Sequence, residues 1–334
     1  MRLRALRIYQ TDGEPSAAAV HAVLESMQLD ALTPGDVLIR VQYSSINYKD
    51  ALAVTGAGRI LRRYPLNGGI DLAGIVVQSQ DPGFQPGQAV LATGCGLSET
   101  LDGGYAEYAR VPAAAVISMP AGLDALAAMT LGTAGFTAAL AIHRMEQNGQ
   151  TSEQGEIAVT GATGGVGSLA IDMLSGRGYS VCAITGKEAE RAYLQQLGVQ
   201  KISLRDELNL GQAALEPVRF AGAIDNLGGE WLSWLLRSTR LMGNVASIGM
   251  AAGSQLQTSV MPFILRGVNL LGITSANTPR PLRELIWQRL ATDLKPAHLD
   301  VIRTRVVELA ELPAVFADYL QGRVRGRTVV HVQD

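Results

Sequence analysis

The glycine-rich stretch at residues 157–167 carries the clearest chemistry in this chain of 334 residues, and it reads Ile-Ala-Val-Thr-Gly-Ala-Thr-Gly-Gly-Val-Gly. Its first three residues are apolar, with a β-branched bias, which predicts a buried parallel strand. From Val166 onward the spacing of apolar residues predicts a helix that ends near Gly176. Glycines between a strand and a helix let backbone N–H groups approach a pyrophosphate at the helix N-terminus, where the helix dipole favours an anion. The stretch therefore predicts a dinucleotide-binding turn, although any tight strand-to-helix turn can use glycine without a ligand.

The next strand indicates which dinucleotide such a turn would hold. Residues 180–185 read Ser-Val-Cys-Ala-Ile-Thr, and Gly186 and Lys187 follow. NAD-specific sites usually place an acidic residue at this point to bind the ribose 2′-hydroxyl. A lysine without an acid would attract a 2′-phosphate, so we expect NADPH rather than NADH. Arg205 is a candidate second phosphate contact, whereas a solvated lysine and an exposed surface arginine are the alternatives.

The elements that would position these residues alternate between strand and helix. Strands are expected near residues 157–160, 180–185, 201–204, 221–225, 243–249 and 268–275, so residues 128–277 predict a doubly wound parallel sheet. Residues 1–127 predict short strands between Gly and Pro turns, as in a barrel-like β domain. The tail, residues 278–334, is assigned back to this β-rich domain. The expected fold class is α/β, with a Rossmann-type sheet inserted into a β-rich domain and the active site between the two.

Composition and charge disfavour several classes of protein. A formal charge of −2 argues against nucleic-acid and membrane-surface binding. We find no uninterrupted apolar run of the ~20 residues that span a bilayer, and the first residues lack an apolar signal core. Cys95 and Cys182 give no disulfide framework, so we expect a cytoplasmic location. The apolar strand at residues 268–275 would lie at a sheet edge, where strands pair readily, and predicts a homodimer.

Six segments together resemble one family. They are residues 44–51 (Ser-Ser-Ile-Asn-Tyr-Lys-Asp-Ala), 69–74 (Gly-Ile-Asp-Leu-Ala-Gly), 132–137 (Gly-Thr-Ala-Gly-Phe-Thr), 160–167, 260–266 (Val-Met-Pro-Phe-Ile-Leu-Arg) and 321–330, which ends Gly-Arg-Thr-Val-Val. On these segments the chain resembles, from end to end, the medium-chain dehydrogenase/reductase superfamily. Within it the chain is similar to the zinc-independent quinone oxidoreductase group and most similar to its acrylyl-CoA reductase (NADPH) branch. The resemblance implies a Rossmann NADPH-binding domain inserted into a GroES-like catalytic domain.

The resemblance also implies that no zinc is bound. Zinc-dependent relatives carry cysteine where this chain has Asn47 and histidine where it has Ile70. A four-cysteine structural site is impossible with two cysteines. The four histidines stand at no ligand spacing, and they are His21, His143, His298 and His331.

The implied reaction is NADPH-dependent reduction of the carbon–carbon double bond of acrylyl-CoA, or of a similar short enoyl-CoA, by hydride transfer to the β-carbon. The implied catalytic residues are Asn47, Tyr48 and Asp50. Tyr48, which would also lie near the nicotinamide, can donate from its phenol, and Asn47 can donate from its amide. Asp50 would act as a structural brace. The alternative for Asn47 is that it only caps a helix that begins after Ile46.

The remaining contacts are implied by the resemblance alone. The pyrophosphate would contact Thr163, Gly164, Gly165 and Val166. The adenosine phosphate would contact Thr185, Gly186, Lys187 and Arg205. The nicotinamide would contact Met250, Ile264 and Ser275. Relatives often carry arginine at Lys187, and a lysine is a point charge rather than a bidentate fork. A basic run, Arg59, Arg62 and Arg63, could bind the phosphates of CoA, with an ordinary charged surface as the equal alternative.

Two other functions stay open at this point. A quinone or free-enone oxidoreductase needs the same hydride geometry but no CoA site. A non-catalytic NADPH-binding or redox-sensing protein needs no catalytic residues, and the presence of Asn47 and Tyr48 argues against it.

Overall fold

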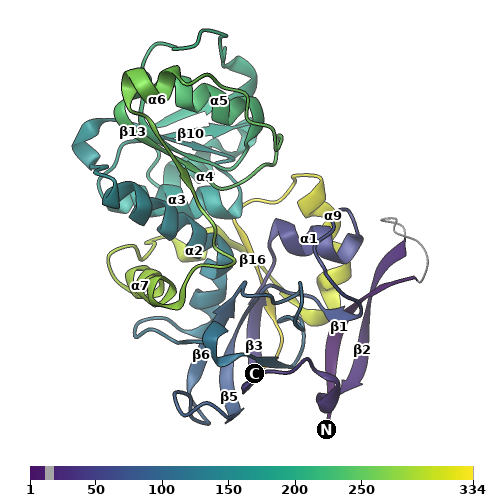
Figure 1. Cartoon of the computed structure of the whole chain (residues 1–334). Coiled ribbons are helices and arrows are strands. Elements are labelled where there is room, and N and C mark those ends of the chain that lie inside the picture. The colour runs from purple at the N-terminus through teal and green to yellow at the C-terminus, as the bar shows by residue number, and fades with distance from the viewer. Residues whose placement is uncertain (12–18, 334) are drawn as a thin grey trace. The chain divides into compact units, whose positions relative to one another are not determined.

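The protein, described here by a computed structural model over residues 1–11 and 19–333, divides into two compact units (Figure 1). Unit 1 comprises Met1–Thr133, Ala276–Ala291 and Leu299–Asp334, and unit 2 comprises Ala134–Ser275 and Thr292–His298. The chain therefore leaves unit 1 to build unit 2 and then returns to complete unit 1.

Unit 1 is β-rich, with one sheet of three strands and one of seven. The three-stranded sheet has the order β2-β1-β4, and the larger sheet has the order β15-β16-β3-β5-β6-β8, with β7 also paired to β3. The strands are β1 (Arg2–Gln10), β2 (Val20–Gln28), β3 (Val37–Ser45), β4 (Leu66–Asn67), β5 (Asp71–Ser79), β6 (Ala89–Thr93), β7 (Tyr108–Val111), β8 (Ile117–Ser118), β15 (Arg303–Glu308) and β16 (Arg327–His331). All pairs are antiparallel except β15 with β16.

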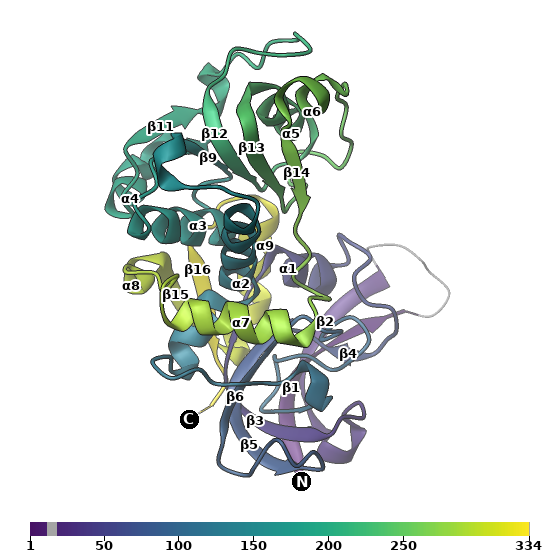
Figure 2. The same ribbon diagram turned by 60° about the vertical axis from the view of Figure 1, so that its left-hand side comes forward.

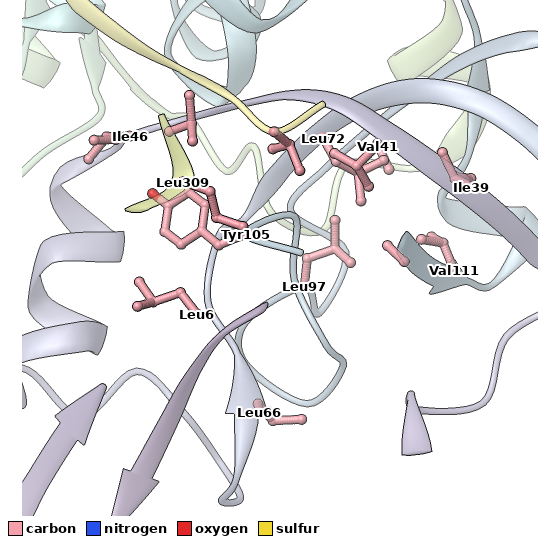
Figure 3. Close-up of a cluster of buried hydrophobic side chains, with 14 of the residues drawn as sticks. Leu6, Ile39, Val41, Ile46, Leu66, Leu72, Leu97, Tyr105, Val111 and Leu309 are labelled. Atoms are coloured by element: carbon pink, nitrogen blue, oxygen red, sulfur yellow. The ribbon is translucent and has the colours of Figure 1, made fainter. Parts of the chain in front are cut away.

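The core of unit 1 takes side chains from both of its sheets (Figure 3). Leu6 comes from β1, and Ile39 and Val41 come from alternate positions of β3, which point to one face of the strand. Tyr105 lies among them with its ring buried, and its hydroxyl donates to the carbonyl of Ser45 at 3.1 Å. Because burial raises the pKa of Tyr105 well above its usual value, the phenol stays neutral in this core.

The helices of unit 1 flank these sheets. They are α1 (Tyr48–Thr55), α7 (Arg280–Ala291), α8 (Leu299–Ile302) and α9 (Leu312–Leu320), with short 3₁₀ turns at Leu29–Ala31, Ala113–Ala115 and Leu309–Glu311. The helices expected from the tail of the sequence correspond to α7 and α9. Helix α1 ends at Gly56, which has a left-handed φ of 69° and so stops the helix without steric cost.

Helix α2 (Ala125–Gln147) starts in unit 1 and continues in unit 2. It is long and apolar enough to cross a membrane by length and composition alone, with a mean hydropathy of 1.7 over its most apolar window. The search of the sequence for uninterrupted apolar runs did not predict such a candidate. However, 78% of that window is buried inside the protein, as in the core helix of a folded domain. The helix is broken at Gly132, whose φ of 51° and ψ of −155° are not helical.

Unit 2 holds a six-stranded, fully parallel sheet with the order β11-β10-β9-β12-β13-β14. The strands are β9 (Ile157–Thr160), β10 (Val181–Thr185), β11 (Lys201–Leu204), β12 (Phe220–Asp225), β13 (Thr239–Ser247) and β14 (Asn269–Gly272). The helices are α3 (Gly165–Gly176), α4 (Arg191–Gln196), α5 (Gly229–Ser238) and α6 (Met261–Arg266). Short 3₁₀ turns lie at Ser152–Gln154, Glu188–Glu190 and Arg205–Glu207. Because parallel crossovers are right-handed, α3 and α4 cover one face of the sheet, and α5 and α6 cover the other (Figure 2). The doubly wound sheet expected from the sequence is confirmed, and its order reverses between β9 and β12.

The sequence predicts that the tail, residues 278–334, belongs to the β-rich unit, but one stretch of it does not. Residues 292–298 belong to unit 2. The backbone N–H of His298 donates to Asp172 of α3 at 3.1 Å, and its ring Nδ1 lies 2.6 Å from the same carboxylate. This anchoring to a buried carboxylate is a tertiary contact that sequence periodicity cannot reveal.

Candidate functional site

The glycine turn predicted from the sequence joins β9 to α3 in unit 2. Gly161 has a φ of 58°, and Gly164 is the residue before the first turn of α3. An added Cβ on Gly167 would collide with the carbonyl oxygen of Gly161, so this glycine lets helix and strand pack closely. The first N–H groups of a helix have no acceptor within it. The turn, which includes Thr163 and Val166, therefore suits a pyrophosphate at a helix N-terminus.

A second group of predicted residues meets beyond the end of β10. The guanidinium group of Arg205 lies against the backbone of Gly186, where an added Cβ would come within 2.6 Å of Nη2. The Nε of Arg205 is buried and has no hydrogen-bond partner in the part of the chain that the structure describes. The backbone N–H of Lys187 donates to the Thr185 hydroxyl at 3.0 Å, which fixes the turn after the strand. A guanidinium group with an unpartnered Nε beside a glycine, with no acid at the strand end, fits a 2′-phosphate.

The residues predicted to line the nicotinamide are only partly brought together. Met250, 68% exposed, follows β13, and Ser275 follows β14, so both lie beyond the carboxyl ends of the strands, where dinucleotides bind. Ile264, 70% exposed, lies on α6 instead. Two residues later Arg266 donates to the carbonyls of Arg237 and Thr239, at the start of β13. A single chain therefore places Ile264 toward the opposite end of the sheet.

In unit 1, Asn47 takes the N-cap position of α1, as the capping alternative predicted. Its side chain also bonds to residues outside this helix. Nδ2 donates to Asp71 at 2.8 Å and to Asp50 at 3.2 Å, and Oδ1 accepts from Arg327 at 3.1 Å. These contacts use both amide protons and engage the oxygen, so the side chain of Asn47 is held within the buried network.

The buried carboxylate of Asp71 gathers several segments that are distant in the sequence. It accepts hydrogen bonds from the Ser45 hydroxyl at 2.6 Å, from Asn47, and from the backbone N–H and hydroxyl of Thr133 at 2.9 and 2.5 Å. Thr133 follows the break in α2 at Gly132, where an added Cβ would lie 2.6 Å from the same carboxylate. Only glycine therefore fits beside this carboxylate.

Arg327 completes this buried network from the opposite end of the chain. Its guanidinium group donates to the carbonyls of Thr130 and Ile46, each at 3.0 Å, to the Ser45 hydroxyl at 2.8 Å and to Asn47. Its nearest nitrogen lies 4.0 Å from the Asp71 carboxylate, and both side chains are almost fully buried. A buried carboxylate is thus compensated by a buried cation that also satisfies the surrounding carbonyls.

Asp50 joins the start of α1 to the segment that leads into β5. Its carboxylate is fully buried and accepts from the backbone N–H groups of Asn47 at 2.8 Å and Ile70 at 2.9 Å. Burial, with the negative charge of Asp71 adding to the effect, raises the pKa of Asp50 to about 7. Asp50 holds the start of α1 to the strand region of β5 and makes no approach to solvent.

Tyr48 and the basic run are the exposed members of the predicted site in unit 1. Tyr48 is the first residue of α1 and is 51% exposed, and its phenol makes no hydrogen bond within the described chain. Arg59, Arg62 and Arg63 are exposed, and their side chains have no ion-pair partner among residues 1–11 and 19–333. Next to them Lys49 pairs with Glu99, and burial together with Arg62 lowers the pKa of Lys49 against the opposing charge of Asp50.

Four polar residues of this network, three of them buried and Thr133 half-buried, received no role from the sequence, although each lies in a segment quoted for the resemblance. They are Ser45, Asp71, Thr133 and Arg327. The available signal was a charged residue within an apolar strand segment, as in Asp71-Leu-Ala-Gly and Arg327-Thr-Val-Val. Within the described chain, no group of three or more His, Cys, Asp or Glu residues could hold a metal ion.

A parallel sheet with a glycine turn at its switch point and a separate β-rich unit with a buried polar network define a nicotinamide-dinucleotide oxidoreductase of two units. Comparison with known families agrees: the alcohol dehydrogenase GroES-like domain matches residues 33–121, and the zinc-binding dehydrogenase family matches residues 165–292. The chain belongs to the medium-chain dehydrogenase/reductase superfamily.

Three relatives show how closely the chain follows this family. It is 45% identical to the putative quinone oxidoreductase YhfP of Bacillus subtilis over 95% of this chain and 96% of the relative, and a crystal structure of YhfP with NAD bound matches with a TM-score of 0.95, over 99% of each chain. It is 41% identical to the acrylyl-CoA reductase AcuI of Ruegeria pomeroyi over 96% of this chain and 97% of the relative. The YhdH oxidoreductase of Salmonella enterica, crystallised with NADP, is 42% identical and matches with a TM-score of 0.94, over 100% of both chains.

Proposed function

We propose that this chain is an NADPH-dependent reductase of the carbon–carbon double bond of acrylyl-CoA or a similar short enoyl-CoA. The similarity to AcuI along nearly the whole chain carries the substrate class. The unpartnered Nε of Arg205 beside Gly186, with no acid at the end of β10, supports the choice of NADPH. When bound, NADPH supplies the hydride that reduces the double bond.

The protein's own contribution is to bind, orient and polarise. Thr163, Gly164, Gly165 and Val166 would hold the pyrophosphate, and the groups around Arg205 would hold the 2′-phosphate. Reduction of an enoyl thioester develops negative charge on the thioester oxygen, and a fixed donor lowers the energy of that charge. Tyr48 is the exposed donor that we assign to this role.

The network beneath Tyr48 would keep its helix in place. Asn47 immediately precedes Tyr48 and is held by Asp71, Asp50 and Arg327. A side chain that is half exposed can therefore be carried on a backbone that is firmly fixed. We assign Asn47 and Asp50 to positioning, with no contact to the reacting atoms.

The three exposed arginines after α1 are our candidates for the phosphates of CoA. Arg59, Arg62 and Arg63 lack acidic partners in the described chain, which leaves their guanidinium groups available. Arg62→Glu with Arg63→Glu should raise the KM for acrylyl-CoA by about tenfold and spare quinone reduction. The matched control is Arg2→Glu with Arg305→Glu, two exposed arginines elsewhere in unit 1, which should change neither KM. Equal effects of the first pair on both substrates would refute the assignment.

A second candidate function is reduction of quinones or free enones, which is favoured by the similarity to the putative quinone oxidoreductase YhfP. The test of both is NADPH oxidation with acrylyl-CoA and with a simple quinone, side by side. A kcat/KM that is orders of magnitude higher for acrylyl-CoA supports the first proposal. A higher kcat/KM for the quinone supports the second, and turnover of neither leaves a non-catalytic NADPH-binding or redox-sensing protein.

We also infer that the protein forms a homodimer through the free edge of β14. We infer in addition that it is located in the cytoplasm. β14 is the last strand of its sheet, and exposed apolar side chains gather on and near it, including Val260, Ile264, Leu265 and Leu270. Such an edge readily pairs with a second copy by an isologous two-fold contact. Both cysteines are free thiols, which suits a reducing compartment. A monomer mass in sedimentation at working concentration would overturn the dimer.

A further inference from the structure

Asn226 lies at the point where the strand order of the sheet in unit 2 reverses. It directly follows β12, and β12 pairs with β9, whose last residue is Thr160 (Figure 2). The side-chain Nδ2 of Asn226 donates to the Thr160 carbonyl at 2.7 Å, and its backbone N–H donates to the Thr160 hydroxyl at 2.8 Å. Asn226 therefore fastens the end of β12 to the residue that precedes the glycine turn.

Further contacts fix the backbone of Asn226 on both sides. The buried carboxylate of Asp225 accepts from the Thr160 hydroxyl at 2.7 Å and from the N–H of Gly228 at 2.8 Å. An added Cβ on Gly249 would collide with the Asn226 carbonyl oxygen. Asn226 is thus held between β9 and the segment after β13 that carries Met250.

These contacts leave one polar atom of the side chain unused. Because Nδ2 donates to Thr160, the remaining side-chain atom is Oδ1, which can only accept. Oδ1 has no hydrogen-bond partner in the described part of the chain, and the residue is half-buried. An acceptor is thus fixed in orientation at the crevice where a doubly wound sheet binds its dinucleotide.

The chemistry of a dinucleotide indicates what would meet this acceptor. Arg205 and Gly186 mark the β10 side of the crevice as the adenosine side, so the β12 side receives the nicotinamide half. That half offers donors from its ribose hydroxyls and its carboxamide, and the ribose is the part attached to the pyrophosphate. The glycine turn that suits the pyrophosphate begins at Gly161, the residue after Thr160, where an added Cβ would lie 3.3 Å from the Asn226 Cβ.

We propose that Asn226 is a cofactor-binding residue whose Oδ1 accepts a hydrogen bond from a hydroxyl of the nicotinamide ribose, while its Nδ2 holds the start of the glycine turn. The assignment rests on the proposed NADPH dependence. It adds a contact on the nicotinamide side that none of the residues predicted from the sequence supplies.

The test compares three ligands by calorimetry or fluorescence titration without turnover. They are NADPH, its fragment 2′-phospho-ADP-ribose, which keeps both riboses, and adenosine 2′,5′-bisphosphate, which lacks the second ribose. Asn226→Leu, of similar size but without polar atoms, should weaken the first two by about five- to tenfold, the value of one neutral hydrogen bond, and leave the third unchanged. Thr160→Val, which removes a clamp contact but keeps the amide, should not show this selective loss.

The outcomes separate the assignment from the proposed function. If wild-type protein binds all three ligands and Asn226→Leu binds them equally well, the assignment is wrong and the proposed function survives. Equal weakening of all three in Asn226→Leu and in the smaller change Asn226→Ser indicates a purely structural role and also overturns it. A selective loss reproduced by Thr160→Val overturns the direct contact as well. Wild-type protein that binds none of the three overturns the NADPH dependence and this assignment together.

Discussion

Replacement of Arg327 by methionine should destabilise unit 1 severely. The guanidinium group is 3% exposed, satisfies two carbonyls and two side chains, and is the cation nearest to the buried carboxylate of Asp71. Methionine has a similar length but no charge, so Asp71 would be left buried and uncompensated. Removal of one partner of a buried ion pair costs about 4 kcal/mol of the free energy of unfolding. An exposed pair provides the contrast, because Arg323 and Asp318 are 58% and 38% exposed, and Arg323→Met should cost less than about 1 kcal/mol.

The assay is urea unfolding of the full chain, followed by circular dichroism and by tryptophan fluorescence. The two units can unfold in separate steps, so the transitions are fitted separately. Trp287 lies in unit 1, whereas Trp231 and Trp234 lie in unit 2, which allows the step belonging to unit 1 to be identified with single Trp→Phe variants. If Arg327→Met does not fold, Arg327→Lys, which keeps the charge and loses most donors, should show a smaller loss. A cost for Arg327→Met no larger than that of Arg323→Met would refute the account of the network.

Three further results are expected. Because the pKa of Asp50 is raised in the folded state to about 7 from its ordinary 3.8, the folded protein binds the extra proton, and stability should fall by up to about 4 kcal/mol as pH rises from about 4 to about 7. Asp50→Asn should flatten this dependence in urea titrations at several pH values, and an unchanged slope would contradict the assignment. Arg205→Ala should weaken NADPH binding by about tenfold or more without changing NADH binding, since only NADPH carries the 2′-phosphate, and equal losses would show that Arg205 holds no phosphate. Tyr48→Phe should lower kcat more than it raises the Kd for NADPH, and wild-type turnover would remove Tyr48 from the mechanism.

The sequence predicted the dinucleotide unit well because its strands are buried on both faces. Such strands read as short apolar runs that alternate with helices, and the strands expected at residues 157–160 and 180–185 match the fully buried β9 and β10. The glycine turn could be predicted because each glycine answers a local steric demand, such as the close approach of Gly167 to Gly161.

The network of unit 1 could not be predicted in the same way. Asp71 and Arg327 belong to strands that are far apart in the sequence, and no local rule pairs them. The motif around Asn47 directed attention to this region, but only the structure shows that both amide protons are donated to carboxylates and that the oxygen accepts from Arg327. The place of Ile264 likewise needs the structure, because α6 carries this residue toward the amino end of the sheet in a single chain.

The discontinuity of unit 1 affects how a newly synthesised chain folds. The end of β3 pairs with β16, with Ser45 opposite Val329, and Asp71 obtains its cation from Arg327. Synthesis reaches β16 and Arg327 only after all six strands of unit 2 are complete. Unit 2 can therefore fold during synthesis, while the first 133 residues wait with an unpaired strand and an uncompensated carboxylate. Without β16, unit 1 would remain incompletely folded. A chaperone that shields apolar strands would therefore act mainly on unit 1.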